Sequence, residues 1–301
     1  MRQRSAEPTP LYRRIQWIYC GVVLAFLILP ILVIIPLSFN ARPYFTFSAD
    51  MLALRPEGYS LRWYLDIVEN GMADPGQAKW TLAYAQDALA HSRWLQAARN
   101  SLFIGLCATV AATILGTVAA LGLSRADLPF RKSIMAILLS PMIVPIVITS
   151  ASLYFFFSGL GLSNTYLGII AAHTLLGVPF VVITVTATLS NYDRALTRAA
   201  ASLGAGPITN FRRIMLPLIF PGMASGALFA FITSFDEVVA VIFLAAPEQR
   251  TIPRQMWSGI REQISPTILA VATIMTLISM LLLGFLETLR KRSASMGAVK
   301  R

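Results

Sequence analysis

The side chains in this sequence that are best suited to chemistry are two neighbouring carboxylates, Asp236 and Glu237, which follow Ser234 inside a long apolar run. An ionised carboxylate is costly within hydrocarbon and normally faces the interior of a bundle or a water-filled path. Adjacent residues on a helix project about 100° apart, so the two acids are not expected to face lipid together. We therefore predict that Ser234, Asp236 and Glu237 line a solute pathway, where unpaired acids favour a cationic solute.

The alternative for the same two acids is a structural role. They can pair with basic groups on a neighbouring helix or loop and so lock the bundle. The candidates just beyond this apolar run are Arg250, Arg254 and Arg261. Both interpretations stay open from the residues alone.

No other reactive set is evident. The sequence contains no G-x-x-x-x-G-K-[ST] phosphate loop, no G-x-S-x-G and no H-E-x-x-H. His91 and His173 lie far apart in the chain, and we interpret His173 as a hydrogen-bonded packing residue. Cys20 and Cys107 lack metal-ligand spacing and are expected to be small buried residues. The chain is therefore expected to be no enzyme, to hold no metal or cofactor, and not to bind ATP by itself.

The composition is that of a membrane protein. Of the 301 residues, 56% are hydrophobic and only 13% are charged, and the mean hydropathy is +0.67. The net charge of +11 would suggest a nucleic-acid partner in a soluble protein. Here the basic residues lie beside apolar runs and no nucleic-acid module is present, so orientation in a lipid bilayer explains them better.

Six apolar runs are long enough to cross about 30 Å of hydrocarbon, which takes roughly 20 helical residues each. They are Trp17–Phe39, Ser101–Leu123, Ser133–Phe157, Tyr166–Leu189, Leu218–Leu244 and Thr267–Leu286. We therefore predict an all-α membrane protein with six transmembrane helices. Its expected parts are an N-terminal tail (1–16), a transmembrane domain (17–289) and a C-terminal tail (290–301).

The basic residues orient this bundle by the positive-inside rule. Sixteen of the 25 basic residues lie in the two tails, in the connection between the second and third runs, and in the connection between the fourth and fifth. The other nine lie in the longer connections of the opposite side. We therefore expect both termini and the connection between the fourth and fifth runs to be cytoplasmic.

The segment 40–100 between the first two runs is expected to form a small extracytoplasmic cap. It balances basic and acidic residues, is interrupted by prolines and glycines, and contains two helical stretches, Leu61–Val68 and Lys79–Leu95. Its composition does not decide whether it receives a partner or only covers the bundle.

A second distinctive stretch, residues 190–217, joins the fourth and fifth runs. We predict two short amphipathic helices that are broken at Gly204-Ala205-Gly206-Pro207, because glycine suits a helix end and proline a first helical turn. Four arginines give it positive charge, namely Arg194, Arg198, Arg212 and Arg213. Such a hairpin is suited to docking another protein, and the alternative is a basic loop that only fixes topology.

This hairpin resembles the cytoplasmic signature of the permease subunits of ATP-binding cassette (ABC) importers, in which Glu-Ala-Ala is followed by Gly and, ten residues later, by Ile-x-Leu-Pro. The family's Glu falls on Arg198, a reversal of charge. The matching residues are Ala199, Ala200, Gly204, Ile214, Leu216 and Pro217.

The resemblance extends over about residues 11–290. Leu61–Tyr64, Asn100-Ser101-Leu102 and Ser234–Ile268 look like the spermidine/putrescine branch of these importers, and more particularly like the second of its two permeases. The stretch Gly71–His91 is longer than is usual for such permeases. Close relatives of this branch carry amino acids, opines and other solutes, which remain the alternative substrates.

The resemblance implies a type I ABC importer permease fold in the plasma (inner) membrane of a bacterium, with a cytoplasmic coupling helix between helices 4 and 5. Residues Arg198 to Pro217 would fit a groove on a cytoplasmic ATPase. The implied partners are a second permease, two ABC ATPase subunits that bind the ATP and Mg²⁺, an extracytoplasmic solute-binding protein and membrane lipid. Two weaker hypotheses are a stand-alone channel or proton-coupled carrier that uses Asp236 and Glu237, and a membrane enzyme.

Overall fold

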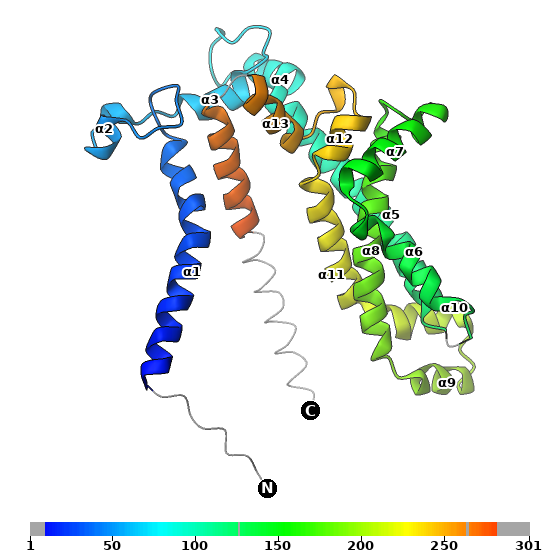
Figure 1. Ribbon diagram of the computed structural model, residues 1–301. Helices are drawn as coiled ribbons and strands as arrows, with labels where there is room; N and C mark the ends of the chain where they lie inside the picture. The colour runs from blue at the N-terminus through cyan, green and yellow to red at the C-terminus, as the bar shows by residue number, and fades with distance from the viewer. Residues whose placement is uncertain (1–9, 126, 263–264, 282–301) are drawn as a thin grey trace. The chain divides into compact units, whose positions relative to one another are not determined.

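The computed structural model describes residues 10–125, 127–262 and 265–281, which form helices and connecting loops with no strand (Figure 1). An isolated antiparallel bridge between Asn40 and Tyr59 is the one extended pairing in these ranges. The chain divides into two compact units. Unit 1 comprises residues 1–70 and 259–301, and unit 2 comprises residues 71–258.

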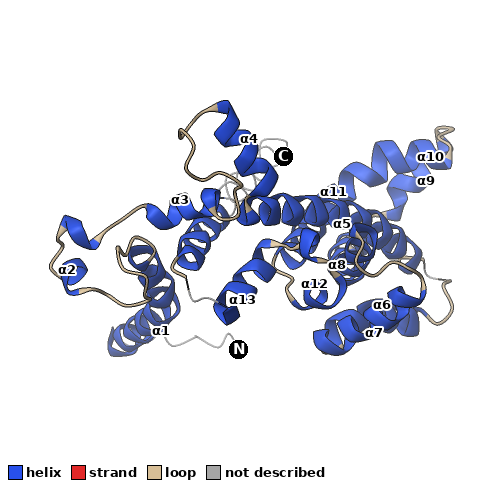
Figure 2. Ribbon diagram, turned by 90° about the horizontal axis from the view of Figure 1, so that it is seen from above, coloured by secondary structure: helices blue, strands red, loops and turns tan. Residues whose placement is uncertain are grey.

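Unit 2 is built around three long helices, α5 (Arg93–Leu123), α8 (Tyr166–Ser190) and α11 (Leu216–Phe235), which pack side by side (Figures 1 and 2). The other elements of this unit are α4 (Leu82–His91), α6 (Arg131–Ile143), α7 (Ile146–Gly159), α9 (Arg194–Ser202), α10 (Pro207–Asn210), the π-helical turn η2 (Phe211–Met215), α12 (Val239–Leu244) and the short η3 (Pro247–Gln249). Helix α13 (Ile252–Glu262) crosses the boundary between the units.

Small residues let these three helices approach closely. A Cβ atom added at Gly116 of α5 would lie 2.6 Å from Val181 of α8, and one added at Gly226 of α11 would lie 2.8 Å from the Cα of Val181. At Gly222 the added atom would lie 2.1 Å from the hydroxyl of Thr188. Close backbone approach of this kind increases van der Waals packing, which is what holds helices together where no water is excluded.

Unit 1 contains α1 (Pro10–Leu37), the short α2 (Ala49–Leu52) and η1 (Pro56–Gly58), α3 (Arg62–Glu69) and an apolar helix over Thr267–Leu281. Side-chain hydrogen bonds tie α3 to the rest of this unit. Tyr64 shares one of 2.7 Å with Ser38, and the indole of Trp63 donates to the carbonyl of Asn40 at 2.7 Å. The hydroxyl of Thr267 donates to the carboxylate of Asp66.

Four helices of the described ranges are long and apolar enough to cross a bilayer, and a bent pair of helices makes up to five. Three of them, Tyr12–Leu37, Arg93–Leu123 and Tyr166–Ser190, begin and end within ten residues of the first, second and fourth predicted runs. The other, Pro207–Phe235, ends within ten residues of the end of the fifth predicted run but begins further from its start. The sixth predicted run, Thr267–Leu286, is an apolar helix as far as Leu281, and its remainder lies outside the described residues.

The third predicted run, Ser133–Phe157, is not one straight helix but two helices with a sharp bend between them. Helices α6 and α7 meet at an angle of 102°. Pro145 offers no backbone N–H to continue the ladder and forces an extended conformation on Val144, whose φ and ψ are −71° and 132°. The pair is a bent span or a re-entrant segment.

The fifth predicted run, Leu218–Leu244, differs at both ends. Its helix begins earlier, since α10, η2 and α11 form one continuous helix over Pro207–Phe235. It also ends earlier, and α12 begins only at Val239. The carboxylates Asp236 and Glu237 therefore lie in a break between two helices and not on one helix, which corrects the expectation that helical geometry separates them.

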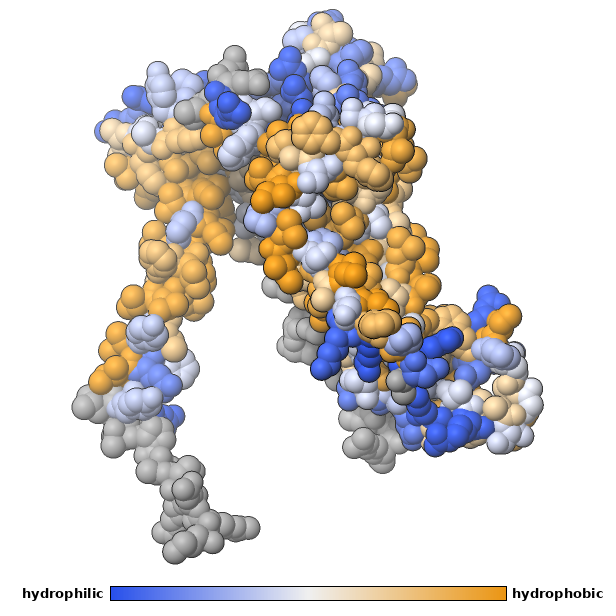
Figure 3. Space-filling model, turned by 45° about the vertical axis from the view of Figure 1, so that its right-hand side comes forward, coloured by the Kyte–Doolittle hydropathy of each residue, from blue (hydrophilic) through white to orange (hydrophobic). Residues whose placement is uncertain are grey.

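On the face shown in Figure 3, apolar side chains fill the middle, and hydrophilic side chains gather at the top and, in unit 2, at the lower end that carries α9 and α10. Cys20 on α1 is exposed and Cys107 on α5 is half-buried. The expectation that both cysteines are buried is therefore wrong for the isolated chain, because helix faces that meet lipid or another subunit are open here.

Candidate functional site

The break between α11 and α12 contains the two acids that the sequence singles out. Helix α11 makes its last helical hydrogen bond from the N–H of Asp236 to the carbonyl of Ile232, at 3.0 Å. Asp236 is exposed, and it has no ion-pair or hydrogen-bond partner for its carboxylate among the described residues. A free carboxylate therefore stands at the carbonyl end of a helix, where the helix dipole is also negative.

The neighbouring acid has a different environment. Glu237 is half-buried, and its carboxylate accepts a hydrogen bond of 2.8 Å from the N–H of Ala240, in the first turn of α12. A carboxylate at this position satisfies one of the free N–H groups of the helix start and favours its positive end. The two acids thus differ in their contacts, since the carboxylate of Glu237 accepts a backbone hydrogen bond and that of Asp236 does not.

Of the three arginines that were candidates to pair with these acids, the two in the same unit, Arg250 and Arg254, do not do so among the described residues. Arg254 instead donates to the carbonyls of Val241 and Ala245, at 3.1 and 2.7 Å, and so binds the carboxyl end of α12. Burial lowers the pKa of Arg254, and the charge of Arg250 lowers that pKa further. Arg250, which lies in the same unit as the acids, forms no ion pair with Asp236 or Glu237 within the described ranges, and Arg261 belongs to the other unit.

His173 of α8 and Ser234 of α11 form a buried hydrogen bond of 2.7 Å between Nδ1 and Oγ. The histidine is 1% exposed and the serine 4%. The other ring nitrogen, Nε2, is also buried and has no hydrogen-bond partner within the described ranges. The sequence predicts a hydrogen-bonded His173, but it does not identify Ser234 as the partner.

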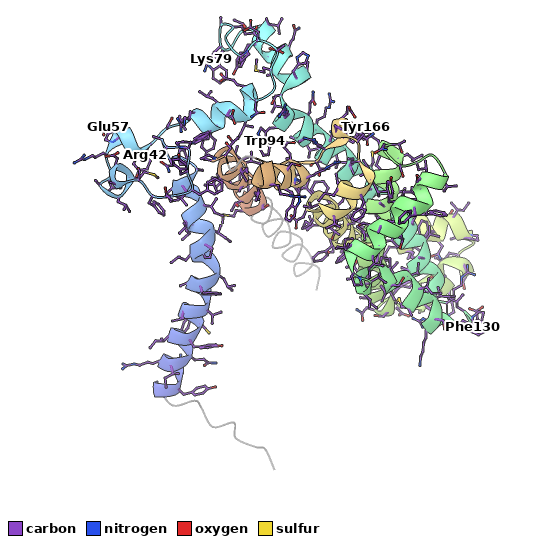
Figure 4. All side chains as sticks on the ribbon, turned by 45° about the horizontal axis from the view of Figure 1, so that its top comes forward. Arg42, Glu57, Lys79, Trp94, Phe130 and Tyr166 are labelled. Carbon is purple, nitrogen blue, oxygen red and sulfur yellow. The ribbon has the colours of Figure 1, made fainter. Side chains whose placement is uncertain are left out.

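The loop after α12 is tied to the first part of α5. The amide of Asn100 donates to the carbonyls of Glu248 and Arg250, at 2.7 and 3.0 Å. Tyr166, labelled in Figure 4, donates to the side-chain oxygen of Asn100 at 2.9 Å. Ser101 accepts a 2.8 Å bond from the N–H of Ile252. In the sequence, Asn100-Ser101 stands out only as part of the family resemblance. The role of these residues in holding the loop after α12 depends on contacts between residues about 150 positions apart.

The hairpin 190–217 has the predicted break. Helix α9 ends in a Schellman motif, in which the N–H of Gly204 bonds to the carbonyl of Ala201 and that of Ala205 to the carbonyl of Ala200. Gly204 has φ of +83°, which L-residues other than Asn and Asp rarely adopt. The second arm differs from the prediction, because it continues through the π-helical turn into α11 and is not a separate short helix.

Most of the hairpin's signature residues are accessible. Arg198, Ala199, Gly204 and Pro217 are exposed, Ile214 and Leu216 are half-buried, and Ala200 is buried. Two large apolar side chains stand out beside them, Leu203 at 88% and Ile208 at 74% exposed. A basic surface with exposed apolar side chains is typical of a protein-binding site. Arg194 holds the hairpin to the end of α5 by donating to the carbonyl of Ser124 at 2.6 Å.

The long stretch Gly71–His91 is organised by Asp87 of α4. Its carboxylate accepts hydrogen bonds from the N–H groups of Ala73 and Asp74, at 3.1 and 3.0 Å, and from the amide of Gln77 at 3.1 Å. The imidazole of His91 lies 2.6 Å away. The backbone donor of Asp74 is the main reason why the pKa of Asp87 lies below its ordinary range.

The described residues contain no cluster of three or more His, Cys, Asp or Glu side chains that could hold a metal ion. Unit 2 thus combines an acid without a partner among the described residues at a helix break, a sharply bent pair of helices and an exposed basic hairpin.

The chain belongs to the family of binding-protein-dependent transport system inner membrane components, which it matches over residues 112–294. Among its relatives is the spermidine/putrescine transport system permease protein PotC of Haemophilus influenzae, which is 28% identical over 272 residues, with 90% of this chain and 95% of the relative covered. The putrescine transport system permease protein PotI of Escherichia coli strain K12 is 32% identical over 257 residues, with 83% and 81% covered. The chain is thus homologous to the permease subunits of polyamine ABC importers, which are transport components and not catalytic subunits.

The fold has a counterpart among solved structures. A chain in the crystal structure of a bacterial ABC transporter involved in the import of the acidic polysaccharide alginate matches with a TM-score of 0.63 at 16% identity, over 92% of this chain and 95% of that chain. At this identity the likeness concerns the fold alone, so the chain shares the helical fold of that transporter chain.

Proposed function

We propose that this chain forms half of the translocation pathway of an ATP-driven, binding-protein-dependent importer for a polyamine, such as putrescine or spermidine. The observation that carries the proposal is similarity to the polyamine permeases PotC and PotI over more than four fifths of the chain. The free carboxylate of Asp236 supports it, because a polyamine is a chain of ammonium groups and an acid in an apolar bundle favours a cation.

The proposed arrangement in the membrane has six spans, with the bent α6–α7 pair as the third. The break between α11 and α12 would lie along the solute path, where interrupted helices of transporters offer charged side chains and free backbone groups to the solute. Both termini and the hairpin would be cytoplasmic in the inner membrane, and residues 40–100 would lie on the other side.

The proposed partners follow from this arrangement. A second, different permease would complete the path, and an extracytoplasmic binding protein would deliver the solute. Two cytoplasmic ATPases would bind ATP and Mg²⁺ and would receive the hairpin, with Gly204 setting its turn and Leu203 and Ile208 offering apolar contacts. This chain would then change shape in response to its ATPases and would hydrolyse nothing itself.

The test is uptake by cells that lack their own polyamine importers and express this chain with its partner subunits. We expect saturable uptake of labelled putrescine or spermidine that stops when the ATPase is inactivated. Uptake of an amino acid or an anion with no polyamine uptake would contradict the proposed polyamine substrate. It would be consistent with an ATP-driven importer of another solute.

A different solute in the same importer class is the second candidate. Family members with other solutes exist, since a probable molybdenum ABC transporter permease of Haloferax volcanii is 32% identical over 171 residues, although these are only 54% of this chain. A stand-alone channel is the less favoured alternative. Purified chain in liposomes that moves putrescine without any ATPase would support the channel and contradict the importer.

A further inference from the structure

We propose that His173 is a positioning residue, which through its hydrogen bond to Ser234 fixes the place where α11 ends and where Asp236 therefore presents its carboxylate. The inference rests on the proposed function for its meaning in transport. The geometry on which it stands, a buried link between two helices beside a helix break, is independent of the solute.

The hydrogen bond between His173 and Ser234 joins a buried helix to the end of an interrupted one. Helix α8, which carries His173, is the most deeply buried of the four long apolar helices. Ser234 lies in the last turn of α11, two residues before Asp236. The 2.7 Å bond between the two side chains spans 61 residues of sequence and is shielded from solvent. A shift of either partner would break a bond that no water can readily replace.

The break itself contains no residue that ends a helix. The segment Ser234–Val239 has neither glycine nor proline, and Val238 and Val239 are only weakly unfavourable in a helix. The interruption is therefore maintained by contacts of side chains. Two such contacts flank it, the bond of Ser234 to His173 before the break and the bond of Glu237 to the N–H of Ala240 after it.

The histidine is not explained by packing alone. A buried ring nitrogen without a partner is unfavourable, and Nε2 of His173 has none within the described ranges. A leucine would fill similar space without that cost, but it could not bind Ser234. Either Nδ1–H donates to the serine oxygen or the serine O–H donates to Nδ1, and both forms make the same link.

The experiment uses side chains that imitate one ring nitrogen each. The amide of Asn reaches the position of Nδ1, and that of Gln reaches the position of Nε2, so His173→Asn can keep the link and His173→Gln cannot. Ser234→Ala removes the link from the other side with little change in volume. The matched control is Thr174→Val, which removes the neighbouring buried hydroxyl of α8, a group that bonds only to its own helix at Ile170.

Two quantities are measured in the complete transporter. The first is the rate at which a membrane-impermeant thiol reagent labels Asp236→Cys, in a background in which Cys20 and Cys107 are replaced. This rate depends on how accessible residue 236 is, and its measurement requires no substrate. The second is the KM and maximal rate of putrescine uptake in variants that keep Asp236, with the amount of assembled complex determined by immunoblot.

We expect His173→Ala and Ser234→Ala each to change the labelling rate and to raise KM by about fivefold, the size expected for the loss of one buried hydrogen bond. His173→Asn restores both quantities, and Thr174→Val alters neither. Unchanged labelling in both alanine variants overturns the proposal, as does rescue by Gln in place of Asn. If labelling follows the expected pattern while the wild-type transporter moves no polyamine, the proposed function fails and the positioning role stands.

Discussion

At the scale of single residues, the two adjacent acids divide into different roles. Glu237 gives its carboxylate to the first turn of α12, whereas Asp236 has no partner in the described part of the chain. In the sequence the two acids look like one feature, because they lie in a single apolar run that predicts one helix. The break between α11 and α12 separates their environments.

This division predicts unequal effects of neutralising each acid. Asp236→Asn should reduce polyamine uptake about tenfold or more, since a charge-assisted hydrogen bond is worth about 1.5–3 kcal/mol. Glu237→Gln should keep most uptake, because its amide oxygen can still accept from the N–H of Ala240. Initial uptake rates at equal membrane levels measure both. Equal losses in the two variants would show that both acids serve the solute.

Gly204 allows a second prediction. Gly204→Val forces a β-branched residue into a left-handed conformation and should uncouple uptake from ATP hydrolysis, at a cost to the turn of about 1–2 kcal/mol. Gly204→Asn should be milder, since Asn tolerates this conformation. The matched control is Gly206→Val, because Gly206 has φ of −67° and, like Gly204, has nothing within 4 Å of an added Cβ. Normal uptake in a well-assembled Gly204→Val transporter would contradict the docking role.

At the scale of elements, packing of helices and capping of helix ends decide the structure. The close contacts of α11 with α8 depend on glycines, since an added Cβ at Gly222 or Gly226 would have no room. Helix α12, only six residues long, is held by Glu237 at its start and by Arg254 at its end. An interrupted membrane helix needs such partners for its free backbone groups.

The packing predicts a severe effect at Gly226. Gly226→Leu would place atoms against Val181 and Thr184, where even a Cβ lies 2.5 Å from the Thr184 hydroxyl, and overpacking typically costs about 1–3 kcal/mol or more. We expect a lower melting temperature in detergent, read by fluorescence-detected size exclusion. Gly122→Leu on α5, where an added Cβ meets nothing within 4 Å, should leave the melting temperature near that of the wild type.

The loop organised by Asp87 predicts a pH dependence of the stretch Gly71–His91. The lowered pKa of Asp87 means that the folded stretch stabilises the deprotonated carboxylate. The stabilisation is therefore fully present above the ordinary Asp pKa of about 3.9 and is lost as the pH falls through the lower folded-state pKa. The protection factors of residues 73–77 in amide hydrogen exchange, taken relative to the intrinsic rate at each pH, should fall on acidification below that range. Asp87→Asn should show fast exchange already at neutral pH, and slow exchange in this variant would contradict the role of the carboxylate.

At the scale of the whole molecule, the apolar surface and the uneven distribution of basic residues set the relation to the membrane. Four long apolar helices, a bent pair and a shorter apolar helix alternate with polar connections. The hairpin lies at the hydrophilic end of unit 2 (Figure 3). A surface of this kind is stable only where lipid or other subunits cover it.

The proposed topology predicts which side each connection faces. Single cysteines at the exposed positions Ser202 and Gly76, in a background without Cys20 and Cys107, should react differently with an impermeant reagent. Gly76→Cys should be labelled from outside the inner membrane in spheroplasts, and Ser202→Cys only after permeabilisation. The opposite pattern would show that the topology is the reverse of the one proposed. The hairpin would then lie on the side of the membrane opposite to the proposed ATPases.

The sequence by itself determined the membrane class, the helical content, the hairpin with its turn at Gly204 and the family resemblance. These properties depend on composition, on apolar runs and on glycine and proline, which act locally along the chain. Only the tertiary structure decided that α11 ends before Asp236, that His173 binds Ser234 and that Asn100 holds the loop after α12. The segment 234–239 contains neither glycine nor proline, and one of the two contacts that flank its break, the bond of Ser234 to His173, joins residues 61 positions apart in the sequence.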